Sequence, residues 1–283
     1  MSREACCSRP VKLFVCACLS ALVATAACGG DDGGGSETGE SETGESAGSN
    51  SGGEQTSAGG EGDAEWEQAY AEKAVGISCD QSADEMAAAG APSLSFDDAT
   101  VYVGFEQIGD NQNPIVARFD GGAMSFCERH ETEGPDGRAL GITWDGGPYA
   151  YVVYTIVGGG SSLEGKGGWI SSYAPGSING GGPKVSVLGR VDTSSGALAS
   201  ATFVIAVKSD NKVNSHSPRA APTVLADGGV EFLGSSAHKP IDSDVTAMDC
   251  TDYPFDSRYV FSEDLGSLVC AQCTNCQAKT PCE

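Results

Sequence analysis

The feature that most constrains the fold is a change of pattern after residue 90. From Ala91 onward, short runs rich in valine, tyrosine, phenylalanine, isoleucine and threonine alternate with clusters of glycine, aspartate, asparagine and proline. Such runs bounded by turn-forming residues are typical of strands, so the sequence predicts an all-β domain over residues 91–269. The predicted strands include 100–105, 149–157, 169–173, 185–191, 202–207 and 230–233. The unbroken apolar character of 149–157 predicts a strand buried on both faces.

Two turn patterns recur in alternation along this domain. The first is an acid, a tight turn and a β run, at residues 97–102, 145–149 and 227–232. The second is an apolar run, an acidic turn that contains glycine, and another apolar run, at residues 117–124, 189–198 and 260–268. Aspartate supplies a side-chain acceptor for the turn backbone and glycine supplies a positive φ. The alternation therefore predicts an internal structural repeat.

The segment 139–147, the Tyr/Val strand after it and the segment 169–173 together resemble the repeats of bacterial secreted β-propellers. Residues 181–206 resemble a group of uncharacterised bacterial exported proteins. The resemblance covers about residues 93–244 and implies propeller-like repeats. It carries over no catalytic residue, because such repeats have no family-wide catalytic set. The uneven repeat spacing leaves a Greek-key β-sandwich as the alternative.

The N-terminus has the pattern of an export signal. Arg3, Arg9 and Lys12 precede an apolar stretch over residues 13–27, which is too short to span a bilayer as a helix and suits a signal peptide. Thr25-Ala26-Ala27-Cys28 resembles the bacterial lipobox, which implies removal of residues 1–27 and a lipid on Cys28. The departure is Thr25, where the motif usually has leucine. The alternative is cleavage at an Ala-x-Ala site over residues 24–26, which would give a secreted protein.

Residues 28–63 are predicted to be a disordered linker after the lipid-anchor cysteine. From Gly29 to Asp63 the chain has nine acidic residues, no basic residue and no hydrophobe larger than alanine, so this segment cannot offset the entropy cost of ordering. The unit Ser-Glu-Thr-Gly-Glu occurs twice in tandem within it, at 36–40 and 41–45. A short helical segment is expected over 64–90, where Trp66, Tyr70 and Ala74 lie four residues apart.

The charge excludes nucleic acid as a partner. The chain carries 39 acidic and 16 basic residues, a formal net charge of −23, and the part after the linker is acidic as well. A nucleic-acid-binding surface needs a basic face to neutralise phosphates.

The cysteines pose the main chemical question. Beyond the signal region and Cys28, seven cysteines remain: Cys79, Cys127, Cys250, Cys270, Cys273, Cys276 and Cys282. An exported protein meets an oxidising compartment, so disulfides are expected, and an odd number leaves one thiol free or paired between chains. The Cys-rich tail over 270–283 also fits a metal or thiol-exchange site, since thiolates separated by two residues ligate zinc and iron–sulfur clusters.

Other candidate sites are sparse. His130, His216 and His238 are the only histidines, and a Ser-His-Asp set around His238 has no Gly-x-Ser-x-Gly elbow to support it. No catalytic residue is therefore assigned. A cluster of carboxylates near the C-terminus makes Ca²⁺ the alternative to no cofactor; its members are Asp242, Asp244, Asp249 and Asp252.

These features together predict an exported cell-envelope lipoprotein. The membrane is its partner through the lipid anchor, and a disulfide-stabilised β domain is displayed as a binding surface for a protein or a glycan. The alternatives are a secreted hydrolase that uses acidic loop residues on a propeller scaffold, and a thiol- or metal-binding envelope protein.

Overall fold

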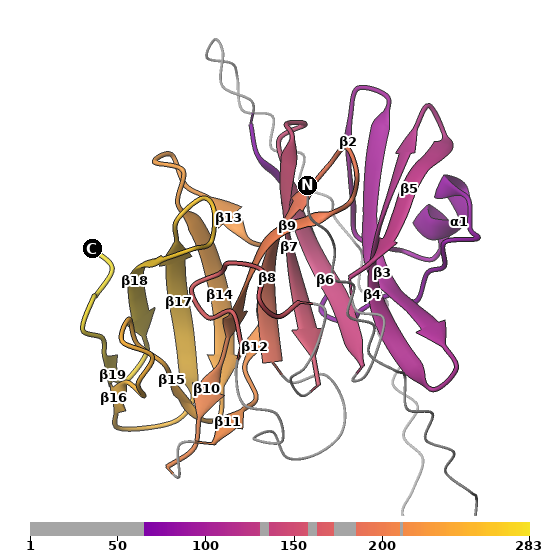
Figure 1. The fold of residues 1–283 in the computed structure, drawn as a ribbon. Coiled ribbons are helices and arrows are strands. Elements are labelled where there is room, and N and C mark those ends of the chain that lie inside the picture. Colours follow the sequence, from indigo (N-terminus) through magenta and orange to yellow (C-terminus); the bar gives the residue numbers. More distant parts are fainter. Residues whose placement is uncertain (1–64, 131–135, 158–162, 173–184, 210–211) are drawn as a thin grey trace, which may run out of the picture. The chain divides into compact units, whose positions relative to one another are not determined.

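The computed structural model describes residues 65–283, apart from 131–135, 158–162, 173–184 and 210–211 (Figure 1). The predicted signal peptide, the lipid-attachment residue Cys28 and the acidic linker lie outside the described residues. In the part that is described, no helix has the length and apolar character needed to cross a bilayer.

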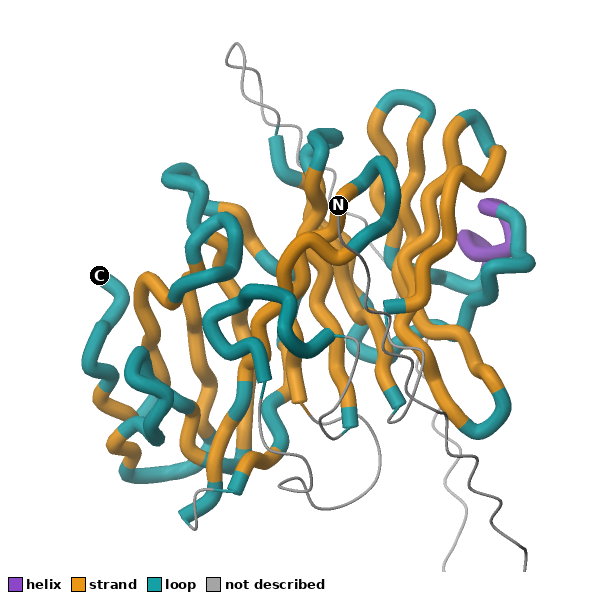
Figure 2. The backbone as a smooth tube through the Cα atoms, viewed as in Figure 1, coloured by secondary structure: helices purple, strands orange, loops and turns teal. Residues whose placement is uncertain are grey.

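The all-β class is confirmed, because strands dominate and the described chain has a single short α-helix (Figure 2). Three antiparallel sheets form the body of the domain. Sheet 1 has the order β2 (Ser93–Phe96), β3 (Ala99–Ile108), β4 (Asn111–Asp120) and β5 (Ala123–Arg129). Sheet 2 has the order β1 (Glu67–Tyr70), β6 (Gly137–Trp144), β7 (Tyr149–Ile156), β8 (Val185–Asp192) and β9 (Leu198–Val204).

Sheet 3 has the order β12 (Ser217–Pro218), β14 (Val230–Ser236), β17 (Phe255–Phe261) and β18 (Leu268–Cys273), and β13 (Thr223–Val224) also pairs with β14. Two smaller sheets complete the described strands. One joins β11 (Val213–Asn214), β10 (Ala206–Val207) and β15 (Lys239–Pro240), and the other pairs β16 (Asp249–Cys250) with β19 (Cys276–Gln277).

The predicted internal repeat is present as three meanders. The first turn pattern joins β2 to β3, β6 to β7 and β13 to β14, and the second joins β4 to β5, β8 to β9 and β17 to β18. Each hairpin of the second kind has a register shift at the same place, two to three residues before the turn: at Arg118/Phe119, Arg190/Val191 and Val260/Phe261. A β-bulge repeated at one position is a structural feature of the unit.

Two turns of the first pattern form for the expected physical reason, whereas Asp97 in the β2–β3 turn and Leu265 in the β17–β18 turn adopt a positive φ without glycine. In the first pattern, the Asp145 carboxylate accepts a hydrogen bond from the Gly147 N–H at 2.8 Å, and Asp227 accepts from Gly229 at 3.0 Å. The left-handed backbone position between them is glycine in both turns, with φ of 82° at Gly146 and at Gly228. A residue with a side chain rarely adopts this conformation, so the Asp-Gly-Gly sequence determines where each hairpin turns.

The three sheets stack face to face, with sheet 2 in the middle. One apolar cluster joins the inner face of sheet 1 to one face of sheet 2, and a second joins the opposite face of sheet 2 to sheet 3. Along β7, Val152 and Tyr154 lie in the first cluster, whereas Tyr151 and Val153 lie in the second. The prediction that this strand is buried on both faces is confirmed.

A third cluster covers the outer face of sheet 1. The helix α1 (Ala83–Ala88) lies beside sheet 1 (Figure 1). It packs there through Met86, which is fully buried and lies in one cluster with Tyr102 and Phe119. Ser82 caps the helix and Glu85 reaches back to the Ser82 backbone, which forms a capping box. The helical segment predicted over 64–90 is therefore confirmed at residues 83–88.

The helix predicted around Trp66, Tyr70 and Ala74 is wrong. Glu67–Tyr70 is strand β1, which pairs antiparallel with β6 from Glu67 opposite Trp144 to Tyr70 opposite Gly141. The open edge of β6 offers backbone hydrogen bonds that a short, weakly amphipathic helix cannot match. Gly141 permits the close approach, because a Cβ there would lie 2.9 Å from the Ala69 carbonyl oxygen.

Two further expectations are corrected. Residues 169–172 are not a strand; Trp169 and Ile170 instead pack into the core from a loop, where the Ile170 N–H donates to Thr202 Oγ1 at 3.0 Å. The boundary placed between 269 and 270 falls inside β18, so the Cys-rich segment is partly a strand of sheet 3.

The order of the strands bears on the two architectures that the sequence predicted, propeller-like repeats and a Greek-key β-sandwich. The described sheets 1 and 2 hold their hairpin-connected strands in sequence order, which is a meander and not a Greek key. No closed propeller is identified among these sheets.

Sheet 2 is buried on both faces and sheet 3 on one. Truncating two neighbouring residues should therefore cost similar stability in sheet 2 and very different stability in sheet 3. Val152→Ala and Val153→Ala should each lower the free energy of unfolding by about 2 kcal/mol, since both side chains are fully buried. In sheet 3, Phe232→Ala should cost about 3–5 kcal/mol, whereas Leu233→Ala, at a side chain that is 37% exposed, should cost less than about 1 kcal/mol. Chemical denaturation of the four variants measures this. Equal effects at Phe232 and Leu233 would contradict the one-sided burial of sheet 3.

Candidate functional site

Three disulfides tie the edges of the domain together. Cys79–Cys127 links the loop before α1 to β5, Cys250–Cys276 links β16 to β19, and Cys270–Cys282 links β18 to the C-terminal segment. The disulfide prediction is confirmed for these six residues, and the odd cysteine expected from the count is Cys273, which is free. Several disulfides in one domain indicate an extracytoplasmic protein.

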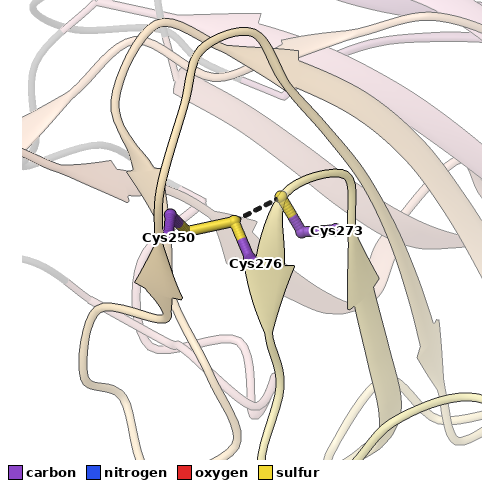
Figure 3. Close-up of side chains that lie close together, drawn as sticks. All are labelled: Cys250, Cys273 and Cys276. Atoms are coloured by element: carbon purple, nitrogen blue, oxygen red, sulfur yellow. Dashed lines mark hydrogen bonds between the residues drawn. A yellow bond between two sulfur atoms is a disulfide. The ribbon is translucent and has the colours of Figure 1, made fainter.

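The free thiol lies beside a disulfide. Cys250 and Cys276 are directly opposite each other on β16 and β19, and Cys273 ends β18 across a turn formed by Thr274 and Asn275. The Cys273 Sγ is 2.8 Å from the Cys276 Sγ (Figure 3). These three sulfur atoms all lie within 4.8 Å of one another, and they are the group of potential metal ligands that the described residues bring together. We call Cys250, Cys273 and Cys276 the sulfur cluster.

The surroundings keep the free thiol protonated. Cys273 is 8% exposed, and burial, reinforced by the nearby Asp256 carboxylate, raises its pKa to about 12. Metal binding and nucleophilic attack both need the thiolate. With two of its sulfurs in a disulfide and the third protonated, the oxidised cluster does not have the donor set of a zinc site.

The aspartates proposed as calcium ligands do not gather into one ligand set in the described structure. Asp242 is buried, and its carboxylate accepts backbone hydrogen bonds from Ser243 and Lys279, each at 2.6 Å. Asp244 is ion-paired with the Lys279 ammonium, which lowers the pKa of that carboxyl to about 2. Asp249 and Asp252 are exposed.

The histidines occupy structural positions. The serine–histidine set imagined around His238 does not form, because it is the His238 backbone N–H that donates to Ser236 Oγ. His130 is buried, with one ring nitrogen 2.7 Å from the Tyr154 hydroxyl and the other 2.8 Å from the Gly196 carbonyl oxygen. Its burial lowers the pKa of the imidazole.

A serine–histidine pair that the sequence did not reveal is buried at sheet 3, between the residue before β12 and strand β17. His216 Nε2 is 2.8 Å from Ser257 Oγ, and both residues are buried. Burial lowers the pKa of His216 to about 3, and its Nδ1 has no hydrogen-bond partner. An imidazole with this pKa and no orienting carboxylate does not act as a general base near neutral pH.

A cleft lies at the turn end of sheets 2 and 3. It has a volume of about 650 Å³ and is bordered by the turn after β6, the turn before β14 and the turn after β17. Three aromatic and two acidic residues dominate its lining: Trp66, Tyr149, Tyr151, Asp145 and Glu263. We call it the aromatic cleft. No single sequence motif marks it, because its residues come from separate repeats.

Protein groups already hold the polar side chains of the aromatic cleft. Arg190 stacks on the Tyr149 ring, 3.6 Å from its centroid, and is ion-paired with Glu263 at 2.6 Å. Tyr151 donates to the Glu263 backbone carbonyl at 2.9 Å, and burial raises its pKa to about 12. Asp145 is engaged by its own turn. The cleft therefore offers aromatic faces and fixed hydrogen-bonding groups, which is the character of a binding site.

Fold and site together define a disulfide-rich all-β domain of the extracytoplasmic type. No family model matches the chain, and no curated protein or solved structure is significantly similar to it. The resemblance to exported propeller-like proteins therefore stays a prediction.

The buried His216 makes the free energy of unfolding depend on pH in a defined window. An unfolded histidine has a pKa of about 6.5, and folding lowers that of His216 to about 3, so the unfolded state takes up a proton first as the pH falls. The contribution is complete above about pH 6.5 and is lost toward pH 3, by up to about 1.4 kcal/mol per pH unit.

His216→Gln should remove this component, which shows as a flatter acid limb when the free energy of unfolding is measured against pH. His238→Gln is the matched control; burial lowers the pKa of this partly exposed histidine as well, so the variant should flatten the acid limb, but less than His216→Gln does. Parallel curves for wild type and His216→Gln would rule out this assignment.

Proposed function

We propose that the protein is a cell-envelope lipoprotein that displays its β domain as a binding surface, with no catalytic role. The signal-like N-terminus, the cysteine at 28 and the acidic linker support anchoring and reach. The three disulfides support an extracytoplasmic location. The three meanders are taken as blades of a propeller-like array.

The observation that carries the binding role is the aromatic cleft. Trp66 and Tyr149 present ring surface at one end of sheets 2 and 3, beside the buried Tyr151 and next to the carboxylates of Asp145 and Glu263. Aromatic faces pack against apolar surface, and carboxylates accept hydrogen bonds from hydroxyl groups. A glycan offers both features, because its rings have apolar faces and hydroxyl edges.

Hydrolysis is not the function we favour. The Asp145 and Glu263 carboxylates are held by a turn N–H and by Arg190, respectively. The pair of serine and histidine that does form, Ser257 and His216, is sealed inside sheet 3. Neither arrangement supplies an accessible acid or base in the form that general acid–base catalysis requires.

The anchor is tested with Cys28→Ser in the full-length chain. Because lipid on Cys28 is proposed to hold the protein at the membrane, the variant should move from the membrane fraction to the soluble exported fraction. Fractionation with metabolic labelling by a fatty acid measures both effects. Cys273→Ser, at a cysteine the proposal does not lipidate, is the control and should stay in the membrane fraction. Unchanged membrane association of Cys28→Ser would contradict the anchor.

The cleft is tested on an array of defined oligosaccharides with the purified exported protein. Trp66→Ala removes an aromatic wall and should weaken binding to the retained oligosaccharides about tenfold or more, the size expected for truncating a central aromatic contact. Tyr253→Ala, at a tyrosine that is 66% exposed and outside the aromatic cleft, should bind as wild type does. The same affinity for both variants, or no bound oligosaccharide at all, would overturn the glycan assignment.

A further inference from the structure

The sulfur cluster has the arrangement needed for exchange between a thiol and a disulfide. In this reaction a thiolate attacks one sulfur of a disulfide and displaces the other. Figure 3 shows the Cys276 sulfur between those of Cys250 and Cys273. The Cys276 Sγ is bonded to the Cys250 Sγ and lies 2.8 Å from the Cys273 Sγ. Cys276 can therefore reach either partner without a large backbone movement.

We propose that Cys273, Cys276 and Cys250 form an intramolecular thiol–disulfide exchange site, in which the bond to Cys276 passes between Cys250 and Cys273. The Cys273 thiol loses its proton and its sulfur attacks the Cys276 sulfur. A Cys273–Cys276 bond forms, the Cys250–Cys276 bond breaks, and the Cys250 thiolate takes up a proton. One thiol and one disulfide are present before and after the step, so no external oxidant or reductant is consumed.

Exchange would change what the covalent bond holds together. The Cys250–Cys276 bond links β16 to β19, two strands that are far apart in sequence. The alternative bond would close only the turn between β18 and β19. The β16 segment would then be held through contacts such as the hydrogen bond from the Thr251 N–H to the Asn275 carbonyl at 2.9 Å.

The product places a reactive group next to open surface. Cys250, whose own side chain is buried, becomes a free thiol on β16, and residues 251–254, which follow it directly, are all exposed. Its thiolate can attack a disulfide of another exported protein, which forms a mixed disulfide and releases that protein's other sulfur as a thiol. The substrate class of the site is therefore a disulfide, first within the chain and then between chains.

The environment of Cys273 restrains the exchange. The thiol is buried, and Asp256 on β17 adds a negative charge nearby, which together hold its pKa high. Other charged or titratable groups on this side are Tyr259 and Arg258 on β17, and Arg219, whose guanidinium lies 4.0 Å from the Asp256 carboxylate. Because only the thiolate attacks, the exchange rate should rise about tenfold per pH unit below the pKa of Cys273.

The experiment follows the two pairings in the oxidised, exported full-length protein. Samples are held at pH 7 and at pH 10, where circular dichroism confirms that the fold is retained. They are quenched in acid, unfolded and alkylated with N-ethylmaleimide at pH 6, and digested with trypsin without reduction. Arg258 lies between Cys250 and Cys273, so cleavage after it separates the two pairings by mass.

The Cys250–Cys276 pairing seen in the structure gives two joined peptides, one with Cys250 and one with Cys273 and Cys276. N-ethylmaleimide then labels Cys273. The exchanged pairing gives a free Cys250 peptide that carries the label. We expect labelled Cys250 to accumulate at pH 10 about a thousand times faster than at pH 7. Labelling confined to Cys273 at both pH values would overturn the proposal.

Variants separate the chemistry from general loosening of the fold. Cys273→Ser lacks the attacking sulfur and should never release Cys250. Asp256→Asn removes the nearby charge and should speed exchange several-fold at pH 8, whereas Asp252→Asn, at an exposed aspartate, should leave the rate unchanged. Release of Cys250 from Cys273→Ser at the wild-type rate would show that another thiol or hydroxide attacks instead, and would refute the site.

A second variant tests the alternative bond directly. Cys250→Ser is reduced at the cluster and then exposed to oxidised glutathione, which accepts the two electrons. The short distance between the remaining sulfurs predicts that Cys273 and Cys276 close into a disulfide in the folded protein. A stable glutathione adduct on Cys276 with no internal bond would contradict the proposed exchange geometry.

Discussion

The structure depends on burying both faces of one sheet. Sheet 2 supplies apolar side chains to two separate clusters, and Val152 and Val153 on neighbouring positions of β7 are both fully buried. A sheet of this kind has no stable exposed face, so it requires a layer on each side. Sheets 1 and 3 provide those layers, and α1 covers the outer face of sheet 1 through Met86.

The disulfides follow from the same constraint. All three lie in the outer layers: Cys79–Cys127 beside α1 and sheet 1, and the other two at the far edge of sheet 3. Sheet 2 contains no cysteine. Hydrophobic burial stabilises the middle layer, whereas the outer layers gain covalent links that limit the entropy of the unfolded chain.

Burial also decides where chemistry can occur. Inside the stack, His216, Tyr154 and Cys273 are all held in their neutral forms, because desolvation disfavours the charged state. Ionisation of these interior groups is therefore suppressed, and the binding surface that we propose lies at the turns at the sheet ends. The aromatic cleft arises there because turns of sheets 2 and 3 bring Tyr149, Asp145 and Glu263 to one place.

The sequence by itself determined the local structure. The all-β class, the double-sided burial of β7, a helical segment within 64–90 and the repeated turns could all be predicted, since each depends on neighbouring residues and on periodicity. The Asp-Gly-Gly turns at 145–147 and 227–229 show this most clearly, because a side-chain acceptor and a left-handed glycine specify the turn without help from the rest of the fold.

Only the tertiary structure decided the pairings between distant segments. Residues 67–70 form a strand because β6 offers an open edge beside Gly141, which no local pattern reports. The partner of each cysteine, the Ser257–His216 contact and the joining of Trp66 to Tyr149 in one cleft likewise depend on how the sheets stack. The physical reason is that these contacts join residues far apart in sequence, whose distances are determined by long-range packing and not by the conformation of either segment alone.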